Sequence, residues 1–285
     1  MKSKLNKKIT ILLVAYNSLN SIKKLLKNID SNFQFLIVDN SPNSILKNKL
    51  KFIKKNITLI VPKKNNGLSY AINIAAKKIR TEYILYMDSD VNMNTNKILK
   101  LLRKAEKIDK FGVLVPKIIN GINYDKLIIK KNIKKNLHQV SFSTGCVMLF
   151  KNKIFRKMKY FDDQFFSYFE ENDYFKRCND NKMPVYLYND VKIFHGGSKS
   201  IDKDLQFSYN KFRNWHYSWS KFYYYKKHFN YLVGVSKTFP NFVRSIKKIL
   251  ISLFQLEFKK LSLHYCELEG LISSYFLIKP FYRIE

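Results

Sequence analysis

The first 110 residues alternate short apolar runs with stretches whose apolar positions recur at helical spacing. After residue 18, for example, Ile22, Leu25, Leu26 and Ile29 fall on one helical face. The apolar runs are apolar at successive positions, which is typical of strands covered on both faces. Strands that alternate with helices predict a parallel α/β sheet. The predicted strands are 9–15, 33–39, 57–61 and 83–87, and the helices are 18–28 (capped by Ser18 or Asn20), 68–78 and 95–108 (capped by Thr95).

Beyond residue 111 the pattern changes to shorter strands and then to long helices. Residues 155–182 carry aromatic side chains, an acidic cluster and a helix, and the chain reads as helical from about residue 204. We therefore expect one α/β domain over 1–203 and a helical C-terminal extension over 204–285. The shorter strands are predicted at 113–115, 118–119, 127–129, 140–150, 185–187 and 191–195.

Polar side chains follow three of the early strands at their carboxyl ends. Asn17 follows the first strand, Asp39 closes the second, and Asp88 and Asp90 follow the fourth. Ligands of open α/β sheets bind beyond the carboxyl ends of the strands. The sequence therefore predicts a binding site at this rim.

Composition permits a folded enzyme and gives little support to a nucleic-acid-binding protein. The 285 residues are 46% hydrophobic and 15% aromatic, enough for a substantial core. The net charge is +32, but 39 of the 53 Lys and Arg lie in residues 1–200 and 14 in residues 201–285, so no single basic block exists. The charge favours anionic partners, and we expect no specific nucleic acid.

The cysteines and the N-terminus indicate the cellular compartment of the protein. Three cysteines without metal-ligand spacing argue for a reducing compartment and against a zinc site. The basic N-terminus precedes a short apolar run that ends in Tyr16-Asn17-Ser18, which favours a strand over a signal peptide. No apolar run reaches the roughly 18 residues of a membrane span. We therefore expect a cytoplasmic protein.

The 21 acidic residues include two tight groups, Asp88-Ser89-Asp90 and Glu170-Glu171-Asn172-Asp173. Crowded carboxylates repel one another unless a cation lies between them, and oxygen-rich sites suit Mg²⁺ or Mn²⁺. The first group would also fit a solvated turn. The second would also fit the acidic start of a helix, or a general base partly desolvated by the neighbouring aromatic side chains.

Seven stretches together resemble the family 2 glycosyltransferases, which have a GT-A fold, and are most similar to the rhamnosyltransferase-like branch. The resemblance covers about residues 9–200. The stretches are 14–17 (VAYN), 37–40 (IVDN), 65–67 (NNG) with Ala71 and Asn73, 86–90 (YMDSD), 143–149 (STGCVML), 161–173 and 195–198 (HGGS).

The resemblance implies roles for individual residues. Asp88 and Asp90, with His195, would hold Mn²⁺ or Mg²⁺, although His195 would also fit a strand-end histidine bonded to the backbone. The family's acidic pair usually reads Glu-Asp with the second residue as base, and here it reads Glu170-Glu171. We therefore expect Glu171 to be the base, with Glu170 and Asp173 as alternatives. Nucleotide-sugar-binding positions would be Ala15, Tyr16, Asn17, Asp39, Asn65, Gly67, Asn73, Asp88 and Ser89.

These roles imply an inverting, metal-dependent transfer from a UDP- or dTDP-sugar to a glycan or a lipid-linked glycan, in cell-surface polysaccharide synthesis. A protein that binds sugar nucleotides or polyanions without transferring sugar is the alternative. The aromatic and basic stretch 213–227 fits either a helix at an anionic membrane surface, at the inner face of the plasma membrane, or a helix packed in the core. A nucleotidyltransferase is disfavoured because a Gly-rich, Lys-bearing phosphate loop is missing near the first strand.

Overall fold

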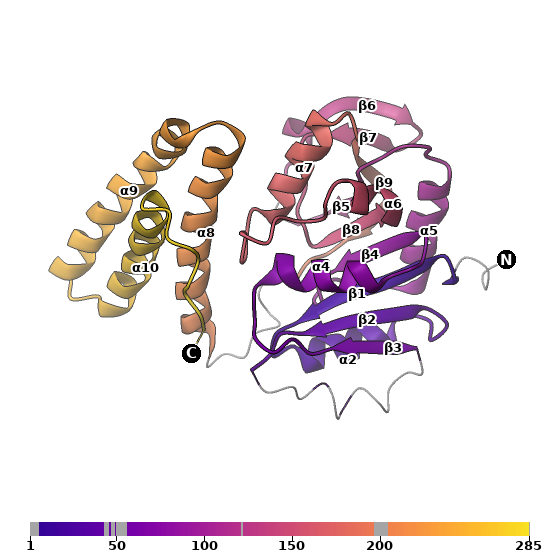
Figure 1. Ribbon diagram of the computed structural model, residues 1–285, viewed down its shortest axis with the longest axis horizontal. Coiled ribbons are helices and arrows are strands. Elements are labelled where there is room, and N and C mark those ends of the chain that lie inside the picture. The colour runs from indigo at the N-terminus through magenta and orange to yellow at the C-terminus, as the bar shows by residue number, and fades with distance from the viewer. Residues whose placement is uncertain are drawn as a thin grey trace. The chain divides into compact units, whose positions relative to one another are not determined.

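The computed structural model describes residues 6–42, 46, 49, 56–120, 122–196 and 205–284. The chain forms two compact units (Figure 1). The first comprises Met1–Asp162 and Glu171–Ser200, and the second comprises Asp163–Glu170 and Ile201–Glu285. The predicted domain boundary at 203/204 lies outside the described residues.

The first unit is built on one mixed sheet of nine strands in the order β3-β2-β1-β4-β8-β5-β9-β7-β6. Strands β1 (Ile9–Ala15), β2 (Gln34–Asp39), β3 (Ile57–Ile60) and β4 (Tyr83–Met87) run parallel. The predicted parallel α/β half is therefore confirmed. In the register, Ala15 pairs with Asp39, so the carboxyl ends of β1 and β2 meet at one rim.

The remaining elements of this unit make the sheet mixed, because β8 runs antiparallel to both β4 and β5. The strands are β5 (Val113–Ile118), β6 (Ile128–Lys134), β7 (Leu137–Val140), β8 (Val147–Lys151) and β9 (Val185–Ile193). The helices are α2 (Leu19–Lys27), α4 (Leu68–Lys78), α5 (Thr95–Glu106), the 3-10 turn η1 (Tyr124–Lys126), α6 (Asn152–Lys157) and α7 (Glu170–Asp180).

Several predicted elements differ from those observed. The predicted strand 140–150 is two strands, β7 and β8, and the two predicted strands between 185 and 195 are one, β9. The cap of α5 is Asn94, whose side chain accepts the N–H of Lys97 at 3.0 Å. Thr95 instead accepts the N–H of Asp30 through its hydroxyl at 2.8 Å. Ser18 precedes α2 without a side-chain capping bond.

An aromatic cluster holds α7 against the sheet. Phe150 on β8 stacks on Phe155 with 4.2 Å between ring centroids and meets Tyr174 of α7 edge-on at 5.4 Å. Phe161 lies edge-on to Tyr174 at 5.4 Å. Phe150, Phe155 and Tyr174 are fully buried, so this packing fixes the N-terminal turn of α7 in the unit.

The second unit contains three long helices, α8 (Gln206–His228), α9 (Tyr231–Phe254) and α10 (Phe258–Tyr275). Trp215 and Trp219 of α8 pack with Cys266 of α10 in its core. The Trp219 indole donates to the carbonyl of Ile278 at 2.8 Å. Of the two interpretations of 213–227, the structure supports a helix packed in the core, because both tryptophans are buried.

The segment Asp163–Glu170 packs within this helical unit, although it lies far from it in sequence. Phe166 stacks on His216 at 4.8 Å, and the Ser220 hydroxyl donates to the Ser167 carbonyl at 2.9 Å. Tyr168 and Phe169 then adopt left-handed backbone conformations, with φ of 66° and 67°. The chain passes from this segment directly into α7. Among the described residues, no helix has the length and apolarity needed to cross a membrane.

Candidate active site

Asp88 is held at the end of β4 by contacts on both sides. Its backbone N–H donates to the Cys146 carbonyl at 2.9 Å, which ties it to the start of β8. Its carboxylate oxygen Oδ1 accepts the hydroxyl of Tyr86 at 2.6 Å. Side chains two residues apart on a strand point to the same face, so Tyr86 is placed to orient this carboxylate.

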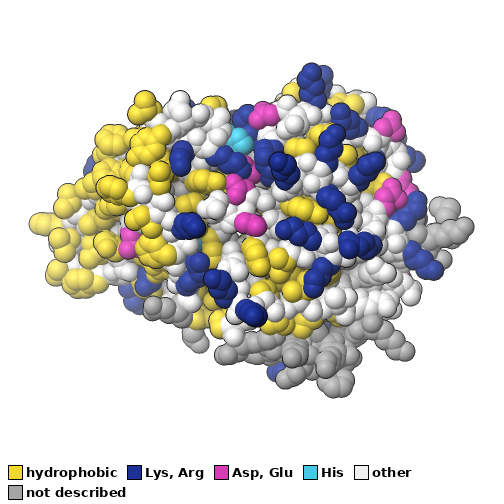
Figure 2. All heavy atoms as spheres, in the orientation of Figure 1, with side chains coloured by type: hydrophobic (Ala, Val, Ile, Leu, Met, Phe, Trp, Pro, Cys, Tyr) yellow, Lys and Arg dark blue, Asp and Glu magenta, His cyan; other side chains and the backbone are white. Residues whose placement is uncertain are grey.

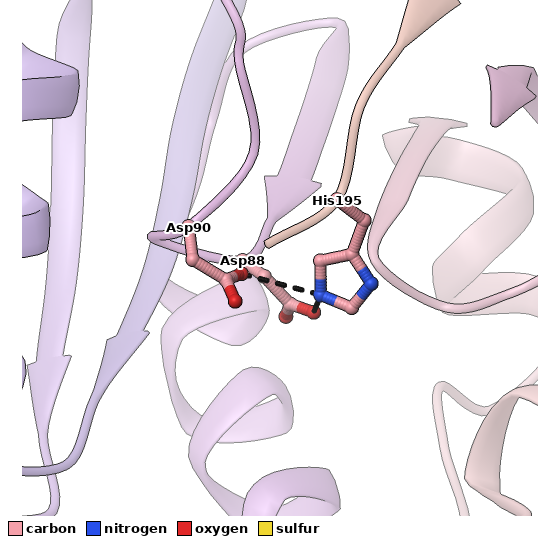
Figure 3. A group of neighbouring side chains, drawn as sticks. All are labelled: Asp88, Asp90 and His195. Carbon is pink, nitrogen blue, oxygen red and sulfur yellow. Dashed lines mark ion pairs between the residues drawn. The ribbon is translucent and has the colours of Figure 1, made fainter. Parts of the chain in front are cut away.

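His195 follows β9 and brings its ring to the two aspartates. Its N–H donates to the Asn120 side-chain oxygen at 3.0 Å, and the Asn120 amide donates to the His195 carbonyl at 2.8 Å. Its ring Nε2 lies 3.4 Å from Asp88 Oδ2 and 3.2 Å from Asp90 Oδ1 (Figure 3). Hydrogen bonds to Asp88 and then Asp90 raise the pKa of His195 to about 10. The main chain is thus bonded as a strand-end histidine would be, while the ring faces the carboxylates.

The three side chains expected to hold a metal ion, those of Asp88, Asp90 and His195, lie together. Their ligand atoms all lie within 4.8 Å of one another. Two carboxylates and an imidazole suit Mn²⁺ or Mg²⁺, and the Tyr86 hydroxyl supplies the outer hydrogen bond that orients such ligands. A Cβ at Gly196 would lie 3.2 Å from Asp90 Oδ2, so a glycine leaves the carboxylate its space.

Glu171, in the first turn of α7, is a partly desolvated carboxylate. Burial, together with the charge of Asp88, raises its pKa to about 7, and nearby backbone N–H groups, including that of Gly145, limit the rise. Its Oε2 is buried and accepts no hydrogen bond from any residue that the structure describes. Such an oxygen is available to take a proton from a bound hydroxyl.

The two alternatives to Glu171 have different surroundings. Asp173 is fully buried, and its Oδ2 accepts the Nε–H of Arg177 at 2.8 Å. Arg177 also donates to the Tyr160 carbonyl at 2.7 Å, so Asp173 belongs to a structural ion pair. Glu170 is 7% exposed and falls in the helical unit. The choice of Glu171 over Glu170 and Asp173 as the base stays a prediction.

The residues expected at the nucleotide lie at the carboxyl ends of β1 and β2. Asn17 has a left-handed backbone, with φ of 48°, and its N–H donates to the Ser41 hydroxyl at 2.9 Å. The Ser41 N–H donates to Asp39 Oδ1 at 3.1 Å, and Asp39 is 1% exposed. Ala15 is buried and Tyr16 is partly buried beside it. The structure therefore gathers Ala15, Tyr16, Asn17 and Asp39 at one rim.

Gly67 forms a turn just before α4, and Asn73 within α4 has a structural role. Gly67 has φ of 98°, a conformation that favours glycine, and its N–H donates to Asn65 Oδ1 at 2.9 Å. Asn73 is buried, donates to the Phe161 carbonyl at 2.9 Å and accepts the Phe161 N–H at 3.1 Å. Asn73 thus ties α4 to the main chain at Phe161, and Ser89 is partly buried between the two aspartates.

Several residues of the site have no role in the sequence-based prediction: Tyr86, Asn120, Gly145 and Cys146. Burial raises the pKa of the Cys146 thiol to about 12, and the charges of Asp88, Asp90 and Glu171 add to the rise. The charges of all three carboxylates act on this thiol, so the two acidic groups of the sequence lie near one another. Tyr86 could have been found, since it lies on β4 two residues before Asp88; Asn120 gives no such signal.

The arrangement is matched by a known family, since the Glycosyl transferase family 2 profile matches residues 10–165. The chain belongs to glycosyl transferase family 2. The predicted family is confirmed, and the matched region of this family 2 chain contains Asp88 and Asp90. The motif residues Gly197 and Ser198 lie outside the described residues.

Two relatives agree with this assignment, and a solved structure matches the fold. The chain is 24% identical over 207 residues to a low-salt glycan biosynthesis hexosyltransferase (Agl10) of Haloferax volcanii, covering 66% of each chain. It is 26% identical over 219 residues to a dTDP-rhamnosyl transferase (RfbF) of Shigella flexneri, covering 69% of this chain and 72% of the relative. The fold matches a mannosyltransferase of Pyrobaculum calidifontis, in complex with GDP-Man and Mn²⁺, at a TM-score of 0.57 and 11% identity, covering 94% and 86%. The predicted GT-A fold is confirmed.

Proposed function

We propose that the chain transfers a sugar, with inversion, from a nucleoside-diphosphate sugar to a hydroxyl of a glycan or lipid-linked glycan. The observation that carries the proposal is a buried, unpartnered carboxylate oxygen on Glu171 in the same site as the Asp88–Asp90–His195 group. Glu171 would provide a base for the acceptor hydroxyl, and the Asp88–Asp90–His195 group would provide a binding place for the charged donor. The glycan-related relatives support the substrate class.

At the donor end, Asp88, Asp90 and His195 would hold Mn²⁺ or Mg²⁺. The cation would supply positive charge that neutralises the leaving diphosphate. Asp39 and the backbone around Asn17 would bind the nucleoside, and the turn at Gly67 allows close approach of a ligand to the main chain. We propose a UDP- or dTDP-sugar donor, and the dTDP-rhamnosyl transferase among the relatives supports this choice.

At the acceptor end, Glu171 would take the proton of the attacking hydroxyl. The hydroxyl oxygen forms a bond to the anomeric carbon while the bond from that carbon to the diphosphate breaks, and the proton passes to Glu171 Oε2. A pKa of about 7 leaves a substantial fraction of Glu171 ionised near neutral pH. Attack opposite the leaving group inverts the anomeric centre.

The free cysteines support a cytoplasmic setting for this reaction. Cys146, Cys178 and Cys266 are unpaired and buried, as expected in a reducing compartment. We propose that the product serves cell-surface polysaccharide synthesis, in keeping with the glycan-related relatives.

A thermal-shift panel of nucleoside diphosphates and sugar nucleotides, with and without Mn²⁺, tests the donor site first. Selective, metal-dependent stabilisation by uridine or thymidine compounds is expected. Incubation of the stabilising donor with short glycan acceptors, followed by detection of the released diphosphate and of the anomeric configuration, then tests transfer. Donor binding without transfer to any acceptor would favour a sugar-nucleotide-binding protein, and no stabilisation by any nucleotide would refute the donor site.

A further inference from the structure

Helix α9 buries its small side chains and exposes its large apolar ones. Its buried residues are Gly234, Thr238, Ser245 and Ser252. A helix of a soluble protein normally turns its apolar stripe to the core and its polar stripe to water. In α9 this order is reversed, so the packing of the helical unit does not account for the large apolar side chains.

The small face of α9 is where the helix contacts its neighbours in the unit. A Cβ at Gly234 would lie 2.8 Å from Phe222 Cε2 of α8, so the two helices approach closely there. The Thr238 hydroxyl donates to the Gly234 carbonyl at 2.8 Å and lies 2.9 Å from the Tyr275 hydroxyl of α10. α9 is therefore already packed on this side, and its outer face is a separate surface.

We call this outer face, together with the turn that follows it, the apolar ridge. Its exposed fractions run from 37% at Ile246 to 91% at Phe254. Hydrophobic side chains crowd the surface over α9 and α10 in the space-filling view (Figure 2). The ridge consists of Leu232, Phe239, Val243, Ile246, Leu250, Leu253 and Phe254 on α9, with Leu256 in the turn and Phe258 at the start of α10.

Positive charge borders the apolar ridge, and α9 contains no acidic residue. With about 100° of rotation per residue, Lys247 falls beside the ridge, and the other cations of the helix fall between it and the buried face. Lys259 and Lys260 follow the exposed turn and are themselves exposed. The cations of α9 are Lys237, Arg244, Lys247 and Lys248.

We infer that the apolar ridge is a membrane-docking surface, with an anionic lipid bilayer as its partner. A helix of this kind lies in the plane of the interface, with its apolar face among the acyl chains and its cations at the headgroups. Phe254, Leu256 and Phe258 would enter the bilayer at the exposed turn. The inference rests on the surface of the helical unit alone and does not depend on the proposed transfer reaction.

Charge favours the bilayer over a second copy of the chain. Leu232, Phe239, Ile246 and Leu253 recur every seven residues, a spacing that would also suit pairing with another helix. Stable pairing of this kind uses acidic side chains opposite basic ones beside the apolar seam. Two copies of α9 would bring only cations together, whereas anionic headgroups complement them.

Vesicle co-sedimentation of the full chain tests the inference. The chain is expected to sediment with vesicles of phosphatidylcholine mixed with phosphatidylglycerol, and much less with phosphatidylcholine alone. A Phe254→Ser/Phe258→Ser variant should lose about tenfold or more of the affinity, because it removes two exposed aromatic side chains that flank the turn. The matched control Ile129→Ser/Ile133→Ser changes exposed apolar residues of β6 and should bind as the unmodified chain does.

Circular dichroism shows whether the Phe254→Ser/Phe258→Ser variant folds. If it does not, a second variant still tests the inference. Lys247→Gln/Lys259→Gln alters only exposed cations and should weaken binding about tenfold while making it less sensitive to salt. No sedimentation of the folded chain with anionic vesicles, or equal binding by all variants, would overturn the inference. So would a dimer in light scattering that the Phe254→Ser/Phe258→Ser variant dissociates, without any vesicle binding.

Discussion

The candidate active site and the apolar ridge of α9 are built in opposite ways. The site collects side chains from the end of β4, the residues before β8, the start of α7 and the end of β9, and main-chain hydrogen bonds hold them at set positions. The ridge comes from one continuous stretch and consists of exposed apolar side chains. The proposed chemistry of the site requires side chains at fixed positions, whereas the proposed membrane docking of the ridge requires only exposed apolar area and charge.

The segment Asp163–Glu170 links the two regions through the chain. It packs in the helical unit through Phe166 and Ser167, and it continues directly into Glu171 of the sheet unit. The segment therefore joins the helical unit, which presents the ridge, to the proposed base through the chain. The predictions that follow separate these two roles.

The largest effect is expected at the carboxylates of the metal-ligand group. Asp88→Ala or Asp90→Ala should lower the rate of transfer by about 10⁴-fold, since the cation supplies several kcal/mol of stabilisation and each 1.4 kcal/mol is about tenfold. Both variants should also lose stabilisation by Mn²⁺ with the nucleoside diphosphate in thermal-shift assays. Vesicle binding should stay unchanged, because these residues lie outside the helical unit.

Asp180→Asn is the matched control for these variants. Asp180 is an exposed carboxylate that pairs with Lys176 on α7. Its replacement should leave transfer and Mn²⁺ binding intact. Full metal-dependent activity in Asp88→Ala would contradict the assigned role of that carboxylate.

The next largest effect is expected at the base. Glu171→Gln should lower kcat about 10²- to 10³-fold while the KM of the donor stays unchanged, because the amide cannot accept the proton. In the unmodified chain, kcat should fall about tenfold per pH unit below a pH of about 7, where Glu171 becomes protonated. Rate measurements across pH with saturating donor check both points.

Glu171→Gln should also change how the stability of the fold depends on pH. Because the pKa of Glu171 rises from 4.5 to about 7 on folding, the folded chain binds more protons, and its stability falls as pH rises through this window. Glu171→Gln should lose less stability over the same window in denaturant titrations. If Glu170→Gln abolishes transfer and Glu171→Gln does not, Glu170 is the base.

The parallel half of the sheet could be predicted from the sequence because its strands are apolar at successive positions. Strands β1 and β4 begin and end where expected. The second half was harder to predict, since the predicted strand 140–150 contains the break between β7 and β8, which periodicity does not locate. The cap of α5 was assigned to Thr95 because Asn94 and Thr95 are both capping residues and adjacent.

Within the site, the sequence indicates which groups carry charge but not what holds them. Asp88 and Asp90 stand out in a basic chain, and their position after a buried strand indicates a rim. The link from Asn120 to the His195 backbone depends on tertiary contacts that leave no periodic signal. The aromatic stretch 213–227 drew attention as a membrane helix, yet its tryptophans are core residues and the apolar ridge lies on α9.

A smaller effect is expected where the site leaves no room for a side chain. A Cβ at Gly145 would lie 3.2 Å from Glu171 Cβ and 3.3 Å from Cγ. Gly145→Ala should displace the carboxylate and lower kcat about tenfold, as a small misplacement of a catalytic group does. The KM of the donor and the melting temperature should change little. An unchanged kcat would show that Glu171 tolerates the shift or takes no part in the reaction.

The smallest effect is expected at the link between the two regions. Ser220→Ala removes the hydroxyl that donates to the Ser167 carbonyl, a bond whose net contribution to stability is about 1 kcal/mol. If this packing positions the segment before Glu171, kcat with a water-soluble acceptor should fall a few-fold, while the KM of the donor and vesicle binding stay unchanged. Ser236→Ala, at an exposed position of α9, is the matched control and should leave kcat unchanged. Equal kcat in both variants would show that the segment reaches its position without the support of α8. Membrane docking would then be the one proposed role left to the helical unit.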